Sequence, residues 1–478
     1  MAQATDRGVL EGGTGRPREP LVDVLIVGGG NAALCAALAA RSRGANVLVL
    51  ERATREWRGG NSKYTRNLRC AHDGHPVMSG SYSSEDFLDD LGHVLGPGSD
   101  PELTRTMISH SRDLPGWIES HGVRWQPAYK GTLQLSRTNW FFLGGGKALL
   151  NAYYASAERA GVQFRYQSQV SELVVSAGRC TGAIVKQGES EVTIPARAVV
   201  VACGGFEANS SWLREVWGAA ADSYVIRGSR HNDGNILKQL LDLGATPCGS
   251  ARAMHAVAVD ARSPKYEGGI VTRIDSVPFG IVVNREGKRF YDEGEDVWPK
   301  RYATWGRLIA EQDGQIAYSI FDSQTLKHFL PGIYPPLEAP SIQELADRLH
   351  LPPGALEETV RTYNSRTPRA GRLDPSRLDQ LRTRELSPPK SNWAQRLDSP
   401  PYFAYPLRPG ITFTYLGVRI GPDTRVLNGT GSFKGLYAAG EIMAGNILER
   451  GYVAGTGMTI GTVFGRMAGE EAARAALH

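Results

Sequence analysis

A glycine-rich turn near the start of the chain constrains the fold more than any other segment. Residues 22–27 (VDVLIV) are apolar and β-branched, residues 28–33 (GGGNAA) follow, and the next residues, LCAALAARSRG, favour a helix. Strand, tight turn and helix in this order predict the first unit of a parallel α/β sheet. The small residues of Gly28-x-Gly30-x-x-Ala33 would let a pyrophosphate approach the backbone and the free N–H groups of the helix.

A carboxylate follows the next predicted strand. Residues 46–50 (NVLVL) form a second apolar run, which ends at Glu51, about 20 residues after the turn. A carboxylate at this point can accept hydrogen bonds from ribose hydroxyls. The pattern suits both FAD and NAD, so by itself it predicts a dinucleotide without choosing between them. The residues that we place at this site are Gly28, Gly30, Asn31, Ala32, Glu51 and Arg52.

Length, charge and cysteine spacing limit the classes of protein that the chain can form. Its 478 residues, 41% of them hydrophobic, suffice for about three domain-sized units, and two substantial domains fit comfortably. The formal net charge of +5 is modest and lacks the dense basic stripe of a nucleic-acid binder, but it is compatible with a small anionic substrate. The five cysteines are scattered without a C-x-x-C pair, so we expect no bound zinc and no iron–sulfur cluster. We also expect the protein to reside in a reducing cytoplasm.

No apolar run is long enough to cross a membrane, which takes about 18 consecutive apolar residues. The nearest candidate, residues 21–40, is interrupted by Asp23, three glycines and Asn31. Residues 1–20 mix glycine, proline and charged side chains and lack the apolar centre of a signal peptide. We therefore expect a disordered leader at 1–20 and a cytoplasmic protein that meets a membrane only through a partner.

Six further segments resemble, in the same order, the cofactor-binding segments of the fumarate reductase and succinate dehydrogenase flavoprotein family. They are RGGNS (58–62), GGGK (144–147), VVVACGGF (199–206), RHNDG (230–234), GLYAAGE (435–441) and GTGMT (455–459). The resemblance implies FAD as the cofactor, because the GLYAAGE strand end is a feature of FAD-binding members.

The same resemblance implies roles for individual residues. The Ser62 hydroxyl would lie beside the isoalloxazine, and the Glu441 carboxylate would meet the ribityl chain. A last helix, starting near Gly455, would point its positive end at the flavin and stabilise negative charge on reduction. Because Lys63 and Tyr64 stand where membrane-bound relatives carry a covalently attached His, we expect noncovalent FAD. The full set of cofactor residues added in this way is Gly60, Asn61, Ser62, Gly145, Gly146, Val170, Ala202, Gly204, Asp233, Glu441, Gly455, Thr456 and Gly457.

The resemblance also implies the domain organisation. In this family a capping domain is inserted into the cofactor domain, and the flavin segments here fall on both sides of a proline-rich middle stretch. We expect an FAD-binding domain at 21–252 and 413–478 and a capping or substrate domain at 253–412. The predicted fold class is α/β, with a Rossmann-like FAD-binding domain split by an inserted α+β capping domain.

Removing two hydrogens from adjacent carbons needs a hydride acceptor, the flavin N5, and a base for the proton beside a carboxylate. In fumarate reductases an arginine of the cap, after an RFVNE-like motif, transfers that proton. Residues 289–293 (RFYDE) resemble the motif and make Arg301 the candidate, although the longer spacing leaves Tyr302 open. Arginine has a pKa above about 12 and is a poor base, so a carboxylate such as Glu293, Glu295 or Asp296 would relay the proton. Alternatively, Arg301 only binds substrate or a nearby acid.

Three other residues complete the expected catalytic set. His255 falls where the family places a histidine that binds a substrate carboxylate, and the alternative is a structural histidine. Arg450 corresponds to the arginine that clamps a second carboxylate, with a surface ion pair to Glu449 as the alternative. Phe413 stands where fumarate reductases carry a second substrate histidine, which argues against a fumarate reductase proper. Tyr415 resembles the tyrosines of ketosteroid dehydrogenases and would polarise or deprotonate substrate, unless it packs at the domain seam.

Four longer stretches resemble the tricarballylate dehydrogenase group of this family. This resemblance implies oxidation of a CH–CH bond, tricarballylate to cis-aconitate, with electrons passing to a separate iron–sulfur or haem protein associated with a membrane. Related proteins serve corrin biosynthesis, so similarity alone does not fix the substrate. The alternatives are a flavin desaturase or reductase for another acid or an enone, similar to fumarate reductase or 3-ketosteroid dehydrogenase, and a flavin electron-transfer subunit. The four stretches are GGGNAALCAALAA, REWRGGNSKYTRNLRC, RFYDEGEDVWPKRYATWGRL and AGNILERGYVAGTGMTIGTVFGR.

Overall fold

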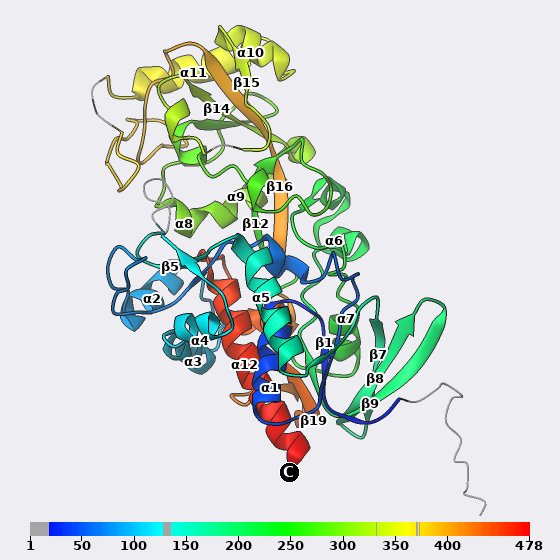
Figure 1. Ribbon diagram of the computed structural model, residues 1–478. Coiled ribbons are helices and arrows are strands. Elements are labelled where there is room, and N and C mark those ends of the chain that lie inside the picture. Colours follow the sequence, from blue (N-terminus) through cyan, green and yellow to red (C-terminus); the bar gives the residue numbers. More distant parts are fainter. Residues whose placement is uncertain (1–18, 128–134, 331, 370, 372) are drawn as a thin grey trace, which may run out of the picture.

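A computed structural model describes residues 19–127, 135–330, 332–369, 371 and 373–478. The leader expected at 1–20 therefore lies outside the described residues, except for Glu19 and Pro20. The molecule is elongated, with one large sheet and its helices at one end and a second sheet at the other (Figure 1).

The larger sheet has eight strands and a parallel centre in the order β6-β2-β1-β9-β19. Its first strand pairs with the second and with the ninth, as the strand–turn–helix pattern predicts. The last of these strands comes from near the C-terminus, so both ends of the chain build this sheet. The strands are β1 (Val22–Val27), β2 (Val47–Leu50), β6 (Gln163–Arg165), β7 (Gln169–Ser176), β8 (Arg179–Gln187), β9 (Ser190–Val201), β18 (Arg425–Asn428) and β19 (Gly431–Ala438).

Two helices from opposite ends of the chain, α1 (Asn31–Ser42) and α12 (Thr456–Leu477), pack against each other beside this sheet (Figure 1). Glycines at four-residue spacing on α12 make the close approach possible. An added Cβ would lie 2.5 Å from the Ala32 carbonyl oxygen at Gly465, and 2.1 Å from the Ala36 carbonyl oxygen at Gly469. The helix that carries the glycine turn is thus held by backbone contact with the C-terminal helix.

Smaller elements surround this part. The helices are α2 (Ser84–Leu91), α3 (Pro101–Ser111), α4 (Leu114–Ser120), α5 (Gly145–Arg159), α6 (Ser210–Trp217) and α7 (Asn235–Asp242). A three-stranded sheet contains β3 (Asn67–Arg69), β4 (Trp125–Gln126) and β5 (Asn139–Phe142), and a two-stranded one contains β11 (Pro247–Cys248) and β17 (Gly417–Val418).

The second large sheet has six strands, mostly antiparallel, and carries helices of its own. The strands are β10 (Val225–Ile226), β12 (Met254–Asp260), β13 (Ile281–Asn284), β14 (Ala317–Asp322), β15 (Leu337–Ala339) and β16 (Tyr402–Thr414). The helices are α8 (Trp298–Arg301), α9 (Trp305–Ala310), α10 (Ile342–Arg348) and α11 (Ala355–Arg366). Short 3-10 helices are η1 (Gly60–Tyr64), η2 (Ala219–Ser223), η3 (Ile270–Thr272), η4 (Val277–Phe279), η5 (Tyr302–Thr304), η6 (Asp313–Gln315), η7 (Leu326–His328) and η8 (Gly440–Asn446).

Two antiparallel strands connect the two parts. β16 runs from the far end of the six-stranded sheet to Thr414, and it pairs with β12, which starts at Met254 (Figure 1). The short strand β10 also joins this sheet, although its residues 225–226 fall within the range expected for the cofactor domain. The predicted fold class, an α/β domain interrupted by an α+β insertion, is confirmed.

Within the described residues, no helix has both the length and the apolar content that a membrane crossing demands.

Candidate cofactor and substrate site

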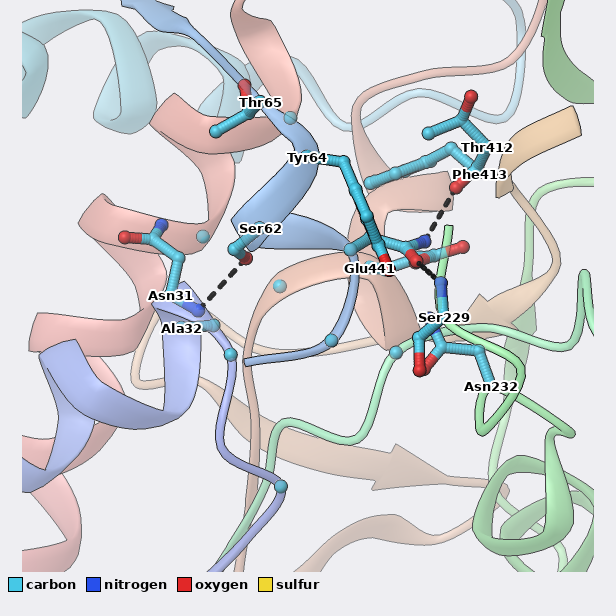
Figure 2. Close-up of a pocket in the computed structure, with 18 of the residues that line it drawn as sticks. Asn31, Ala32, Ser62, Tyr64, Thr65, Ser229, Asn232, Thr412, Phe413 and Glu441 are labelled. Carbon is cyan, nitrogen blue, oxygen red and sulfur yellow. Dashed lines mark hydrogen bonds between the residues drawn. The ribbon is translucent and has the colours of Figure 1, made fainter. Parts of the chain in front are cut away.

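A large cavity opens where the carboxyl ends of β1, β2 and β9 face the beginning of the six-stranded sheet. Including its opening to solvent, it measures about 1680 Å³, which is room for a dinucleotide and a small substrate. Most of the cofactor residues expected from the sequence line it, and Figure 2 shows several of them around the central space. They are Gly28, Gly30, Asn31, Ala32, Glu51, Arg52, Gly60, Asn61, Ser62, Val170, Ala202, Gly204, Asp233, Glu441, Gly455 and Gly457.

Three expected cofactor residues lie behind this lining. The backbone N–H of Gly146 donates to the carbonyl of Thr65, and an added Cβ there would lie 2.1 Å from the carbonyl oxygen of Ser62. Gly145 and Gly146 therefore support the loop that carries Ser62. Thr456 is fully buried as the first residue of α12, between two glycines that line the cavity.

The glycine turn fits a pyrophosphate. Gly28 has a φ of +113°, and an added Cβ would lie 2.4 Å from the carbonyl oxygen of Ala202. Gly30 is the N-cap of α1 and adds no side chain of its own at the start of that helix, where an anion is favoured. The backbone N–H of Asn31 donates to Ser62 Oγ at 3.0 Å (Figure 2). This hydrogen bond joins the turn to the RGGNS segment, residues 58–62.

Glu51 packs against the glycine turn, because an added Cβ at Gly29 would lie 2.3 Å from Glu51 Oε2, and Arg52 follows it in the chain. The Glu51 carboxylate is buried, accepts hydrogen bonds from the N–H groups of Ala53 and Gly59, and has a pKa raised by burial. Arg52 Nη1 lies 2.5 Å from Asp233 Oδ2, so two residues predicted from separate segments form one ion pair. The Glu51 carboxylate suits the ribose of the dinucleotide.

His255 is the one expected catalytic residue that lines the cavity. Its ring is stacked on Tyr452 at 4.1 Å and meets Tyr302 edge-on at 5.3 Å between centroids. Its Nε2 is buried and has no hydrogen-bond partner among the described residues. Burial, and then the charges of Arg227 and Arg273, lower the pKa of His255 well below 6.5, so the ring is neutral at neutral pH.

Arg301, Arg450 and Tyr415 lie elsewhere, and the roles expected for them stay predictions. Arg301 Nη2 lies 3.1 Å from Glu295 Oε1, and Arg450 is exposed. The fully buried Tyr415 donates its hydroxyl to the carbonyl of Gly451 at 2.7 Å.

The neighbour of Arg301, Tyr302, does line the cavity. α8 ends at Arg301 and η5 begins at Tyr302, and successive residues of a helix point in different directions. The longer spacing after Glu293 thus presents the tyrosine to the cavity and leaves the arginine beside Glu295.

Three arginines that the sequence analysis did not single out line the cavity: Arg66, Arg227 and Arg273. Arg227 is buried and donates to Thr412 Oγ1 at 2.6 Å, and burial and the charge of Arg273 lower its pKa. These arginines belong to none of the glycine motifs. Arg66 and Arg227 nevertheless lie within four residues of the RGGNS and RHNDG segments. That closeness in the sequence is the signal that could have indicated these two arginines as residues of the site.

One carboxylate partly offsets these charges. Arg273 binds Asp275 through Nε at 2.5 Å and Nη2 at 2.7 Å, and Arg66 Nη2 lies 3.7 Å from the same side chain. The Trp298 indole N–H also donates to Asp275, and the arginines hold the pKa of this carboxyl below its ordinary value despite its burial. Among the described residues, Arg227 forms no ion pair with a carboxylate, so this end of the cavity suits an anion.

Comparisons with known proteins agree with this geometry. The family model described as "FAD binding domain" matches residues 23–457. The fumarate reductase (cytochrome) of Shewanella frigidimarina is 27% identical over 468 residues, covering 95% of this chain and 77% of that protein. The NADH:fumarate oxidoreductase of Klebsiella pneumoniae (strain 342) is 25% identical over 95% of this chain, which spans only 48% of that relative's length.

A solved structure shows the same fold. The open conformation of a flavocytochrome c3 fumarate reductase superposes with a TM-score of 0.76 and 23% identity, over 96% of this chain and 79% of that one. The expectation of an FAD-dependent oxidoreductase is confirmed at the level of the family. Because the family model covers most of the sequence, the chain belongs to the FAD binding domain family, and its cofactor is FAD.

Proposed function

We propose that the protein is an FAD-dependent dehydrogenase that oxidises a CH–CH bond of a small polycarboxylate, with tricarballylate, giving cis-aconitate, as the leading substrate. The observation that supports it is the convergence of Arg66, Arg227, Arg273 and His255 at the end of the cavity formed with the cap. Buried arginines bind carboxylates through paired, charge-assisted hydrogen bonds, which a neutral ligand cannot satisfy.

Each residue of this cluster has a role in the proposal. Arg227 and Arg273 bind substrate carboxylates, and Asp275 orients Arg273 from behind. The neutral His255 donates its unpaired Nε2–H to a carboxylate oxygen. Tyr302, between His255 and Arg273, takes the substrate proton as the tyrosinate, the form that the charges of Arg273 and Arg227 stabilise.

FAD, when bound, supplies the acceptor for the hydride and its two electrons. Ser62, Asn61 and Glu441 would hold it on one side, and Gly28 and Gly30 would hold its pyrophosphate. The base removes the other hydrogen as a proton, so the two C–H bonds give up one hydride and one proton in total.

A panel of substrates tests the proposal. The FAD-loaded protein is mixed without oxygen with tricarballylate, succinate or a 3-ketosteroid, and bleaching of the visible flavin absorbance is followed while the product is identified. Bleaching by tricarballylate with formation of cis-aconitate is the expected result. Reduction of the flavin by the 3-ketosteroid alone would contradict the polycarboxylate assignment and indicate an enone-type substrate. If none of the three compounds reduces the flavin, the dehydrogenase proposal is contradicted.

We also propose that the electrons leave through a separate iron–sulfur or haem protein at a membrane. The Shewanella relative, a fumarate reductase of the cytochrome kind, supports haem as the acceptor chemistry. Reoxidation of the reduced protein by a haem protein, a ferredoxin and NAD⁺ compares the acceptors directly. Fast reoxidation by NAD⁺ alone would contradict this part of the proposal.

A further inference from the structure

Two glutamates lie together beneath one side of the cavity. Glu207 follows β9 and is 0% exposed, whereas Glu441 follows β19, is 8% exposed and lines the cavity. They meet because β9 and β19 are parallel neighbours, so that the segments after their carboxyl ends lie at the same edge of the sheet. The resemblance to the flavoprotein family implies that Glu441 contacts FAD, whereas it implies no role for Glu207.

The first carboxylate oxygen of Glu207 joins several loops of the cavity. Glu207 Oε1 accepts hydrogen bonds from Asn61 Nδ2 and Asn232 Nδ2, both at 2.6 Å. Asn61 also donates to the carbonyl of Thr412 at 2.7 Å and accepts the N–H of Ser229 at 2.8 Å. Figure 2 shows Ser229, Asn232, Thr412 and Glu441 gathered on this side of the cavity.

The second oxygen, Glu207 Oε2, is buried and has no donor among the described residues. The N–H of Phe206, the residue before Glu207, donates to Thr414 Oγ1 at 3.2 Å, and that hydroxyl donates to Glu441 Oε1, so the two glutamates are neighbours whose side chains interact. Glu441 Oε1 is already held by the N–H of Thr414 at 2.8 Å and its hydroxyl at 3.2 Å. Ionised carboxylates have no donor, so a direct hydrogen bond between two of them requires that one is protonated.

We propose that Glu207 and Glu441 share one proton, and that through this proton Glu207 fixes the orientation of Glu441 toward bound FAD. Glu207 does not line the cavity and would act through Glu441, so it is a positioning residue. The inference concerns the cofactor, and it holds whichever substrate the protein oxidises.

Burial and charge favour the shared form. Burial raises the pKa of Glu207; burial and then the charge of Glu207 raise the pKa of Glu441 well above its ordinary value. The other titratable groups that face Glu441 are Cys203, Tyr415 and Tyr452, and burial raises the pKa of each, so they stay neutral.

The backbone beside Glu207 limits how far one oxygen of Glu441 can move. An added Cβ at Gly205 would lie 2.3 Å from Glu441 Oε1, so the backbone packs directly against this oxygen. Loss of the shared proton at alkaline pH would place two negative charges together in a buried site and weaken FAD binding.

The variant Glu207→Gln tests this directly. Its amide oxygen accepts from Asn61 and Asn232, and its NH₂ donates to Glu441, which reproduces the protonated form permanently. Glu207→Leu is the control, because it has a similar volume and neither donor nor acceptor. The dissociation constant of FAD is measured on the apoprotein at a series of pH values from about pH 6 to about pH 9.

We expect the wild-type affinity for FAD to fall with rising pH, the glutamine variant to lose this dependence, and the leucine variant to bind at least tenfold more weakly throughout. Infrared spectra of the apoprotein supply a second readout: a buried protonated carboxyl band at neutral pH, absent from Glu207→Gln. If the glutamine variant keeps the wild-type pH dependence, or if no such band exists, the inference is wrong. Should the leucine variant not fold, the glutamine variant and the infrared band decide alone.

Discussion

The guanidinium carbon of Arg273 lies 4.6 Å from the centre of the Tyr302 ring. Burial raises the pKa of Tyr302 to about 12, while the charges of Arg273 and Arg227 act in the opposite direction and stabilise the tyrosinate. The arrangement lets one phenol exchange a proton with a ligand held by the same arginines, as a general acid or base must.

Tyr302→Phe should therefore slow reduction of the flavin by substrate about a hundredfold or more, the usual contribution of general acid–base catalysis. Because the phenol does not bind the carboxylates, the affinity for a nonreactive polycarboxylate should change only a few fold. Anaerobic stopped-flow mixing measures the first quantity and titration of the flavin spectrum measures the second. Arg301→Met is the matched comparison. A slower flavin reduction in that variant, with an unchanged rate in Tyr302→Phe, would assign the proton transfer to Arg301 instead.

Arg227 should contribute to binding of the substrate anion. Its guanidinium is buried at the cavity and bonded to Thr412, so Arg227→Met removes a positive charge from a site of low polarity. A hydrogen bond to a charged group is worth about 1.5–3 kcal/mol, so the dissociation constant of the polycarboxylate should rise about 10- to 100-fold.

The same flavin titration measures this change, with the exposed Arg105→Met as the control for lost surface charge. FAD content should be unchanged in both variants. Equal polycarboxylate affinity in the two would show that Arg227 has no part in anion binding.

His255 makes the stability of the protein depend on pH in a direction that can be derived. Its pKa is well below 6.5 in the folded protein but near 6.5 in the unfolded chain, so the unfolded chain binds the proton first. The contribution of His255 to the free energy of unfolding is therefore fully present above pH 6.5. It is lost as the pH falls below that value, by up to about 1.4 kcal/mol per pH unit. Urea unfolding of wild type and His255→Asn at several acidic pH values isolates this contribution, and parallel curves for the two would contradict it.

The contact between α1 and α12 predicts opposite outcomes for two glycine-to-alanine changes. Gly469→Ala would place a methyl group 2.1 Å from the Ala36 carbonyl oxygen, and forced overpacking of this kind costs about 1–3 kcal/mol. Gly116 in α4 has open space around its Cβ position, so Gly116→Ala should raise stability by up to about 1 kcal/mol. Thermal unfolding of the two variants checks both signs, and equal effects would show that the helix contact is not tight.

The cofactor end of the site was predictable from the sequence because its signals are local. A glycine turn between an apolar strand and a helix specifies its own backbone geometry, and Gly28 and Gly30 line the cavity as the pattern predicts. The substrate end was not predictable in this way. Arg66, Arg227 and Arg273 come from three segments without a shared motif. The pairing of β10, β12 and β16 brings the segments of Arg227 and Arg273 together, whereas Arg66 precedes β3 in another sheet.

The choice between Arg301 and Tyr302 shows a second limit. A similar motif located a stretch that reaches the cavity through Tyr302, but one residue of rotation about a helix axis decides which side chain lines the cavity. Glu207 shows a third limit, because a buried carboxylate beside another one has no signature in the order of residues. The role proposed for Glu207 depends on its contact with Glu441, which is 234 positions later in the chain.

The placement of α12 has a consequence for biosynthesis. The turn at Gly28 is translated before the helix that braces it, residues 456–477, which is made hundreds of residues later. The six-stranded sheet between them can fold while translation continues, since domains generally fold as units on the ribosome. The cofactor therefore has no complete binding site on the nascent chain until this helix emerges, and shortage of FAD in the cell should expose the protein to proteolysis at that late stage.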